Sequence, residues 1–130
     1  MHEFAALIRQ HLAERGWDRL RPSDLAKSIM IEGAELLEIF QWDNQTPEEV
    51  KADASKMERI KKELADVLIY AFDLAVTLDI DMDEIAKSKL EKVKEKYPVE
   101  LFNPETRAGE AGTEEAYRRV KEEYRREGKN

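Results

Sequence analysis

Apolar residues recur at every third or fourth position along almost the whole chain. No stretch alternates apolar and polar residues for long enough to indicate a β-strand, so the pattern predicts an all-α protein. The helices are expected over residues 2–15, from 22 to about 43, from 47 to about 78, from about 82 to 97, and over about 114–127.

Residues typical of helix ends separate these segments. Gly16 ends the first helix, and Pro22-Ser23-Asp24 is a typical start of the second. Thr46 is expected to cap the third helix, with Glu48 and Glu49 favourable in its first turn. Residues 52–56 are weakly patterned, so we expect the third helix to fray or bend there. The segment 98–113 contains two prolines and two glycines and is expected to be irregular.

The helices predict an antiparallel four-helix bundle over residues 1–100, followed by a loop and a charged C-terminal helix over 101–130. The segment 65–78, ADVLIYAFDLAVTL, is apolar nearly all round. A small bundle cannot bury every side of one helix, so a second chain is expected to cover part of it. We therefore expect a homo-oligomer, either a homodimer or a homotetramer.

Composition narrows the class of protein. The chain has 130 residues, 39% of them charged, with a net charge of −7 and no cysteine. An acidic surface argues against a nucleic-acid binder or a protein of anionic membranes, and the absence of cysteine excludes disulfides and thiolate zinc sites. The N-terminus has no signal-like apolar run and no long apolar segment follows, so we expect a cytoplasmic protein.

Two acidic pairs with the same spacing stand out, Glu32-x-x-Glu35 and Glu63-x-x-Asp66. Residues three apart on a helix leave the same side, about one turn apart. In helical projection, Glu32 and Glu63 fall inside the apolar arcs of their helices, and Glu35 and Asp66 lie at the margins. Hard carboxylate oxygens favour Mg²⁺, with Mn²⁺ as the alternative, so the pairs predict a metal site.

Pairing with lysine is the other way to make buried carboxylates tolerable. Lys27 lies well off the face of Glu32, and we expect Lys61 and Lys62 to be poorly placed to neutralise Glu63. Glu38 continues the acidic series, and an exposed position and a metal-supporting or water-orienting role are about equally expected for it. Asp73 is similar and slightly less favoured as a functional residue.

Two other classes compete with a magnesium enzyme. A di-iron carboxylate protein needs a Glu-x-x-His motif on two helices, and neither His2 nor His11 follows an acid by three residues. A non-catalytic helical dimerisation module explains the amphipathic stripes and the apolar third helix, but not the acids inside those stripes.

Three segments closely resemble a known family, the MazG-like all-α nucleoside triphosphate pyrophosphohydrolases. They are LAKSIMIEGAELLEIFQW at 25–42, KELADVLIY at 62–70, and Lys89 followed by Lys96-Tyr97-Pro98. The similarity covers about residues 4–100 and is strongest to the short branch that includes the dCTP pyrophosphatases. One position departs: Val93 stands where close relatives often carry asparagine. The resemblance therefore does not fix the preferred base.

The resemblance implies hydrolysis of a nucleoside or deoxynucleoside triphosphate to its monophosphate and pyrophosphate. It assigns Glu32, Glu35, Glu63 and Asp66 as ligands of Mg²⁺ and as catalytic residues, with Glu38 beside them. The substrate-binding residues expected with them are Trp17, Lys27, Trp42, Tyr70 and Lys89, of which the aromatic ones match residues that line the nucleoside pocket in similar enzymes. The chemistry agrees, because a divalent ion removes the repulsion between a triphosphate and acidic residues and activates water.

Overall fold

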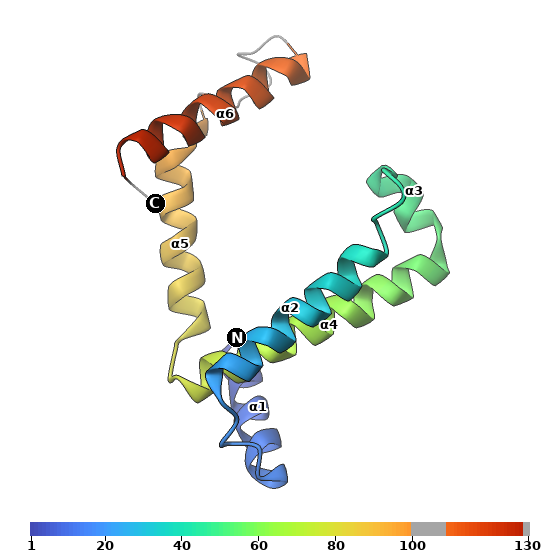
Figure 1. Ribbon diagram of the computed structural model, residues 1–130, viewed down its shortest axis with the longest axis vertical. Coiled ribbons are helices and arrows are strands. Elements are labelled where there is room, and N and C mark those ends of the chain that lie inside the picture. The colour runs from blue at the N-terminus through green and yellow to red at the C-terminus, as the bar shows by residue number, and fades with distance from the viewer. Residues whose placement is uncertain (100–108, 129–130) are drawn as a thin grey trace. The chain divides into compact units, whose positions relative to one another are not determined.

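The structure, a computed structural model, describes residues 1–99 and 109–128. Every regular element in these ranges is a helix, which confirms the expected all-α fold (Figure 1). The helices are α1 (His2–Arg15), α2 (Pro22–Glu38), α3 (Pro47–Ala52), α4 (Ala54–Thr77), α5 (Met82–Lys96) and α6 (Gly109–Arg126). The chain divides into two compact units, Met1–Asp83 and Glu84–Asn130.

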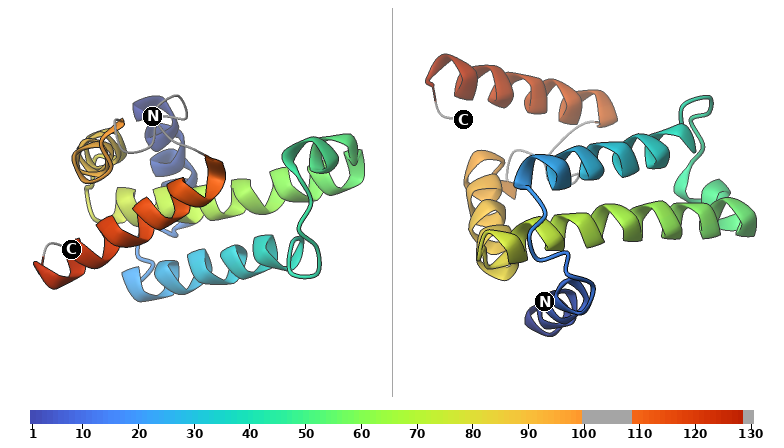
Figure 2. Two further views of the ribbon diagram at one scale, coloured as in Figure 1. Left: turned by 90° about the horizontal axis from the view of Figure 1, so that it is seen from above. Right: turned by 60° about the horizontal axis from the view of Figure 1, so that its bottom comes forward.

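The first unit is built on the pair α2 and α4. These two helices run antiparallel and side by side along most of their length, as the views of Figures 1 and 2 agree. α1 packs against the C-terminal half of α4, where Ile8 and Leu12 meet Phe72 and Val76 in a buried cluster. The ring of Phe4 meets Phe72 edge-on, with the ring centroids 4.9 Å apart. Of the four helices expected in the bundle, this unit contains α1, α2 and the long helix α4, whereas most of α5 belongs to the second unit.

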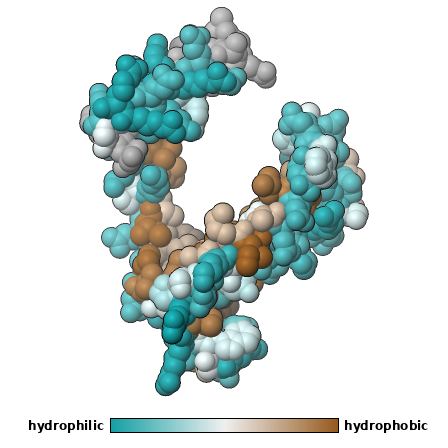
Figure 3. Space-filling model, in the orientation of Figure 1, coloured by the Kyte–Doolittle hydropathy of each residue, from teal (hydrophilic) through white to brown (hydrophobic). Residues whose placement is uncertain are grey.

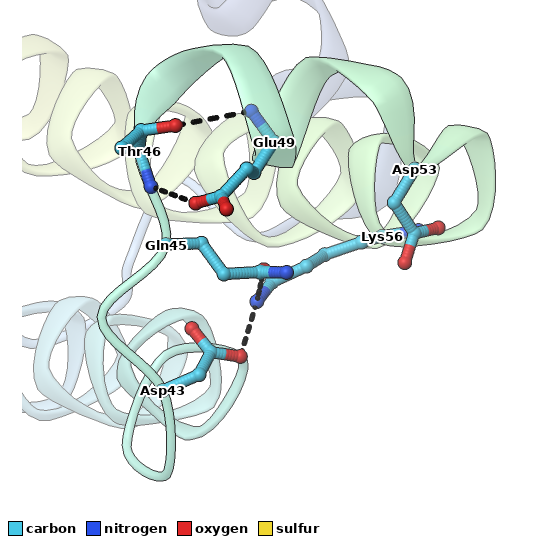
Figure 4. Close-up of polar contacts among 6 residues, drawn as sticks. All are labelled: Asp43, Gln45, Thr46, Glu49, Asp53 and Lys56. Atoms are coloured by element: carbon cyan, nitrogen blue, oxygen red, sulfur yellow. Dashed lines mark hydrogen bonds and ion pairs between the residues drawn. The ribbon is translucent and has the colours of Figure 1, made fainter.

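α2 ends earlier than expected, at Glu38 instead of about Asp43. The chain turns after Glu38, and a buried lysine of α4 holds the connecting segment (Figure 4). Lys56 Nζ lies 2.6 Å from Asp43 Oδ2 and 2.7 Å from Gln45 Oε1, and 5.1 Å from the centroid of the Phe40 ring. The apolar period of the sequence continues to Trp42 but carries no signal of this distant cation, so the predicted end was wrong.

The expected bend in the third helix is a full break. Thr46 caps α3 as expected, in a reciprocal capping box with Glu49, also drawn in Figure 4. Asp53 then adopts an extended conformation, and its side chain accepts a hydrogen bond of 2.9 Å from the backbone N–H of Lys56. An aspartate in that position stabilises a new helix start, so α3 and α4 are separate helices.

The second unit contains most of α5 and all of α6. Tyr97, just after α5, stacks on Tyr117 of α6 with ring centroids 5.2 Å apart, and the Lys96 ammonium lies 4.4 Å from the centre of the Tyr124 ring. α6 starts at Gly109, earlier than the expected start near 114. Much of the segment expected to be irregular, and the expected domain boundary at residue 100, lie outside the described residues.

Large apolar side chains remain exposed on the helix pair of the first unit. We call this set the apolar face: Met30, Ile31, Leu37, Leu64 and Leu68. Apolar side chains are visible over α2 and α4 in Figure 3. No helix in the described parts of the chain carries an apolar stretch long enough to cross a membrane.

Candidate metal centre and adjoining pocket

The α2–α4 pair brings three of the four paired acids together. Glu32 comes from α2, and Glu63 and Asp66 come from successive turns of α4. One carboxylate oxygen of each lies within 4.8 Å of the corresponding oxygens of the other two. Their separation of 31 to 34 residues in sequence disappears because the two helices run antiparallel and pack along their length. We call these three residues the carboxylate cluster.

The cluster is partly withdrawn from water. Glu63 is buried, with 9% of its surface exposed, and Glu32 and Asp66 are half-buried. Burial raises the pKa of the Glu32 carboxyl above its usual value, and nearby acids raise this pKa further. Those acids are Glu35, Asp66 and Glu63, in decreasing order of effect. The negative charges of the cluster therefore destabilise one another.

One prediction about lysines was wrong. Lys62 Nζ lies 3.0 Å from Glu63 Oε1 and 4.0 Å from Asp66 Oδ2, so this lysine does partly neutralise the pair. The hydrogen bond to Glu63, followed by the charge of that carboxylate, raises the pKa of Lys62. Lys62 precedes Asp66 by four residues, which places the two side chains on the same side of α4, and its long, exposed side chain also reaches Glu63.

Lys62 satisfies only part of the cluster. It reaches Oε1 of Glu63, whereas the buried Oε2 has no hydrogen-bond partner among the described residues. A buried carboxylate oxygen without a partner costs free energy, and a divalent cation is a suitable partner for it. Three carboxylates from two rigid helices are also the ligand type that Mg²⁺ and Mn²⁺ prefer. The residues present fit such an ion.

The two remaining acids of the α2 series lie apart from the cluster. Glu35 is exposed and is not grouped with the three clustered carboxylates, although its charge is the largest acidic contribution to the raised pKa of Glu32. Glu38 is exposed at the last residue of α2. The assignment of Glu35 as a metal ligand therefore stays a prediction, and so does the supporting role of Glu38.

A cavity of about 390 Å³ adjoins the cluster at Asp66. Its wall includes two of the predicted aromatic residues, Trp17 from the segment between α1 and α2, and Tyr70 from α4. Leu25, which is buried, adds an apolar surface to the same wall. This wall also carries polar side chains, among them Asp24, Ser28 and Asp66. A concave cavity of mixed lining that opens beside the carboxylate cluster is a candidate small-molecule site.

Three other predicted substrate residues lie elsewhere. Trp42 is 88% exposed in the turn after α2 and does not line this cavity. Lys27 is exposed, and its ammonium lies 3.0 Å from Asp24 Oδ1 on the same helix. Lys89 is exposed on α5, in the second unit. Their roles stay predictions.

The structure adds His11 of α1, which the sequence did not single out, and places Asp73 of α4, which was weighed as a less favoured functional residue, on the same wall. Both line the cavity, and the His11 ring meets Trp17 edge-on with centroids 5.8 Å apart. Two signals were available. His11 lies on the apolar side of the first helix, and Asp73 follows Asp66 by seven residues, which places both acids on one face of α4.

A second group of possible ligand atoms belongs to His2, Asp81 and Asp83. Here the charges already have partners, because the Met1 ammonium lies 3.3 Å and His2 Nε2 3.5 Å from Asp83 Oδ2. Ion pairs within the chain account for this group, whereas the carboxylate cluster keeps a buried Glu63 oxygen without a partner among the described residues.

Comparisons with known proteins agree with this architecture. A model of the MazG-like family matches residues 27–110. The chain is 32% identical over 103 residues to dCTP pyrophosphatase 1 of Mus musculus and 30% identical to that of Rattus norvegicus. The matched part is 78% of this chain and 61% of each relative, so the chain spans less than two thirds of their length.

A solved structure is also similar, that of a pyrophosphatase from Archaeoglobus fulgidus. It is 41% identical in sequence, with a TM-score of 0.66 over 75% of this chain and 92% of the other. The segment matched by the family model contains all three residues of the carboxylate cluster. Sequence and helical fold therefore agree on one family. This chain belongs to the MazG-like family.

Proposed function

We propose that the protein is a magnesium-dependent nucleoside triphosphate pyrophosphohydrolase, which cleaves a deoxynucleoside triphosphate to its monophosphate and pyrophosphate. The observation that carries this proposal is the carboxylate cluster next to an aromatic cavity, joined by Asp66, which belongs to both. Relatives named dCTP pyrophosphatase support a nucleotide substrate, with dCTP as the first candidate.

The two parts of the site divide the work. Glu32, Glu63 and Asp66 would hold Mg²⁺ or Mn²⁺, and Glu35, one turn along α2 from Glu32, is the candidate for a fourth ligand. Trp17 and Tyr70 offer aromatic surfaces to the nucleoside. What a bound ion supplies is neutralisation of the phosphate oxygens and a lower pKa for a coordinated water.

The site has no need of a side-chain nucleophile. The chain lacks cysteine, and its two histidines, His2 and His11, lie outside the carboxylate cluster. Water is therefore the nucleophile at the bond between the α and β phosphates, and Glu38, exposed on α2, is the candidate for orienting that water. The pyrophosphate leaves with the negative charge, which a bound divalent ion would stabilise.

A panel of deoxynucleoside triphosphates with Mg²⁺, with separation of the products, tests this proposal. Release of pyrophosphate and monophosphate, lost when the metal is chelated, is the expected result. Diphosphate and phosphate as products would contradict the cleavage position. Inertness towards every nucleotide would contradict the activity and would favour a helical dimerisation module, for which the exposed apolar face is the supporting feature.

A further inference from the structure

Asp73 is an acid that the proposed reaction does not use. It lines the cavity from α4, yet only 6% of its surface is exposed. Its Oδ1 is buried and has no hydrogen-bond partner among the described residues. Burial raises the pKa of its carboxyl, and the charge of His11 opposes that rise. A buried acid without a partner is costly, so its presence beside a cavity calls for a ligand that supplies one.

The position of Asp73 relative to the metal centre indicates which part of a nucleotide it meets. Asp66 and Asp73 are two helical turns apart on one face of α4, a rise of about 10 Å. Tyr70 lies between them on the same helix, and all three line the cavity. A nucleotide whose phosphates are at Asp66 and whose sugar and base lie along Tyr70 and Trp17 presents the edge of its base to Asp73.

We propose that Asp73 is the residue that selects the base, by accepting a hydrogen bond from the exocyclic amino group of cytosine or adenine. This inference rests on the proposed function, because it takes the cavity as the nucleoside pocket. The amino group donates to the Asp73 carboxylate at the cavity wall, where Oδ1 has no hydrogen-bond partner among the described residues. A base with a carbonyl oxygen at that position, such as uracil, places lone pairs against lone pairs and is disfavoured.

The nucleotides dCTP and dUTP form a matched pair for the test, since they differ only in the amino or carbonyl group and the ring proton next to it. At about pH 8, where the ionised carboxylate is favoured, the wild-type enzyme should prefer dCTP in kcat/KM by about tenfold or more. Asp73→Asn should reduce the preference to about threefold or less, because an amide can present either its oxygen or its NH₂ group. The change should appear mainly in KM, since Asp73 does not touch the phosphates.

Two further variants make the result specific. Asp79→Asn makes the same chemical change at an exposed turn after α4, where the left-handed backbone suits asparagine, and it should keep the preference. Asp73→Leu has a similar shape without polar atoms, so it should weaken dCTP binding without gaining dUTP. Circular dichroism identifies any variant that does not fold.

Binding of the monophosphates dCMP and dUMP, measured calorimetrically without metal, separates this inference from the proposed function. If no nucleotide is hydrolysed, the proposed function fails, and the binding preference still decides the role of Asp73. Equal affinity of the wild-type protein for dCMP and dUMP would overturn the inference. So would an Asp73→Asn variant that folds and keeps the full preference for the amino-bearing base.

Discussion

Glu32 shows at the scale of one residue why the carboxylate cluster needs a cation. Its pKa is raised by burial and by three neighbouring acids, so the folded protein without metal holds this proton more tightly than an unfolded chain does. Removing the charge at Glu32 or Asp66 relieves the repulsion, but it also removes a ligand. Stability and activity should therefore change in opposite directions.

Glu32→Gln and Asp66→Asn should each lower pyrophosphate release by about a hundredfold or more, since metal activation of the water is lost. Without metal, both variants should melt at the wild-type temperature or above it. Mg²⁺ at about 100 times its dissociation constant should stabilise the wild-type protein by about 2.7 kcal/mol and the variants much less. Melting curves with and without Mg²⁺, alongside the activity assay, measure both effects.

The control for these variants is Glu58→Gln. Glu58 is an exposed acid on α4, the helix of Asp66, and it pairs with Lys61. The variant should retain activity and the stabilisation by Mg²⁺, because a surface ion pair contributes little. Unchanged pyrophosphate release by Glu32→Gln or Asp66→Asn would refute the ligand assignment.

The raised pKa of Asp73 predicts that the free energy of unfolding depends on pH. Its folded pKa lies above the usual 3.8, so between these two values the folded state binds more protons than the unfolded chain. The contribution of Asp73 to the free energy of unfolding therefore falls as the pH rises through that window.

Asp73→Asn removes this titration, so its melting temperature should rise relative to wild type as the pH is raised from below about 4 to neutrality. At the acidic end the two proteins should be nearly equally stable. Thermal melts across this pH range measure the difference, and Asp79→Asn provides the reference. A difference that is constant with pH, or largest in acid, would show that the burial of Asp73 is not costly.

The sequence predicted some site residues better than others, for a physical reason. Glu32, Glu63 and Asp66 could be grouped because helical spacing fixes where each points, and the antiparallel pairing of two long helices does the rest. The spacing of four residues between Lys62 and Asp66 was a signal for an ion pair on α4, whereas the contact of Lys62 with Glu63 depends on several rotatable bonds and could not be predicted. The resemblance assigned Trp42 to the nucleoside pocket, but the structure places it, exposed, in the turn after α2. The path of that turn depends on long-range contacts, which the spacing of apolar residues does not predict.

At the scale of elements, α4 carries Asp66 at the carboxylate cluster and Asp73 at the far wall of the cavity, and its Lys56 determines where α2 ends. Lys56, two turns before Glu63 on the same face, is buried and binds the segment after α2. The sequence predicted weak helical order near this position but not the break at Asp53, because one capping aspartate decides it. The expected length of α2 was wrong because the contacts of Lys56 join residues 11 and 13 positions apart.

Lys56→Met should lower the free energy of unfolding by about 1–3 kcal/mol, because Asp43 loses a close ionic partner and Gln45 a hydrogen bond. Methionine keeps most of the buried volume, so the loss reports polar contacts and not a cavity. Denaturant unfolding measures it. Lys51→Met, an exposed lysine on α3, should change stability by less than about 0.5 kcal/mol, and equal effects of the two changes would contradict the role given to Lys56.

At the scale of the whole molecule, the apolar face on α2 and α4 is a candidate surface for association with a second copy of the chain, because its large side chains are exposed to water. Leu64 and Leu68 are 54% and 47% exposed, one turn apart on the helix that carries the carboxylate cluster. A charged chain with a net charge of −7 repels its own copies at long range, so association has to come from apolar contact. The homodimer or homotetramer was expected from the apolar segment 65–78 of this helix, and Leu68 belongs to both that segment and the apolar face.

Leu68→Glu should therefore reduce the mass in solution, measured by sedimentation or light scattering, from a multiple of 15.2 kDa towards that of a single chain. Burial of a leucine at an interface contributes about 1.5–3 kcal/mol per copy, and a buried unpaired glutamate opposes it further. Leu7→Glu on α1, which is 56% exposed, makes the same change outside the apolar face and should leave the mass unchanged. A wild-type protein with the mass of one chain at micromolar concentration would show that the face is not covered by a second copy.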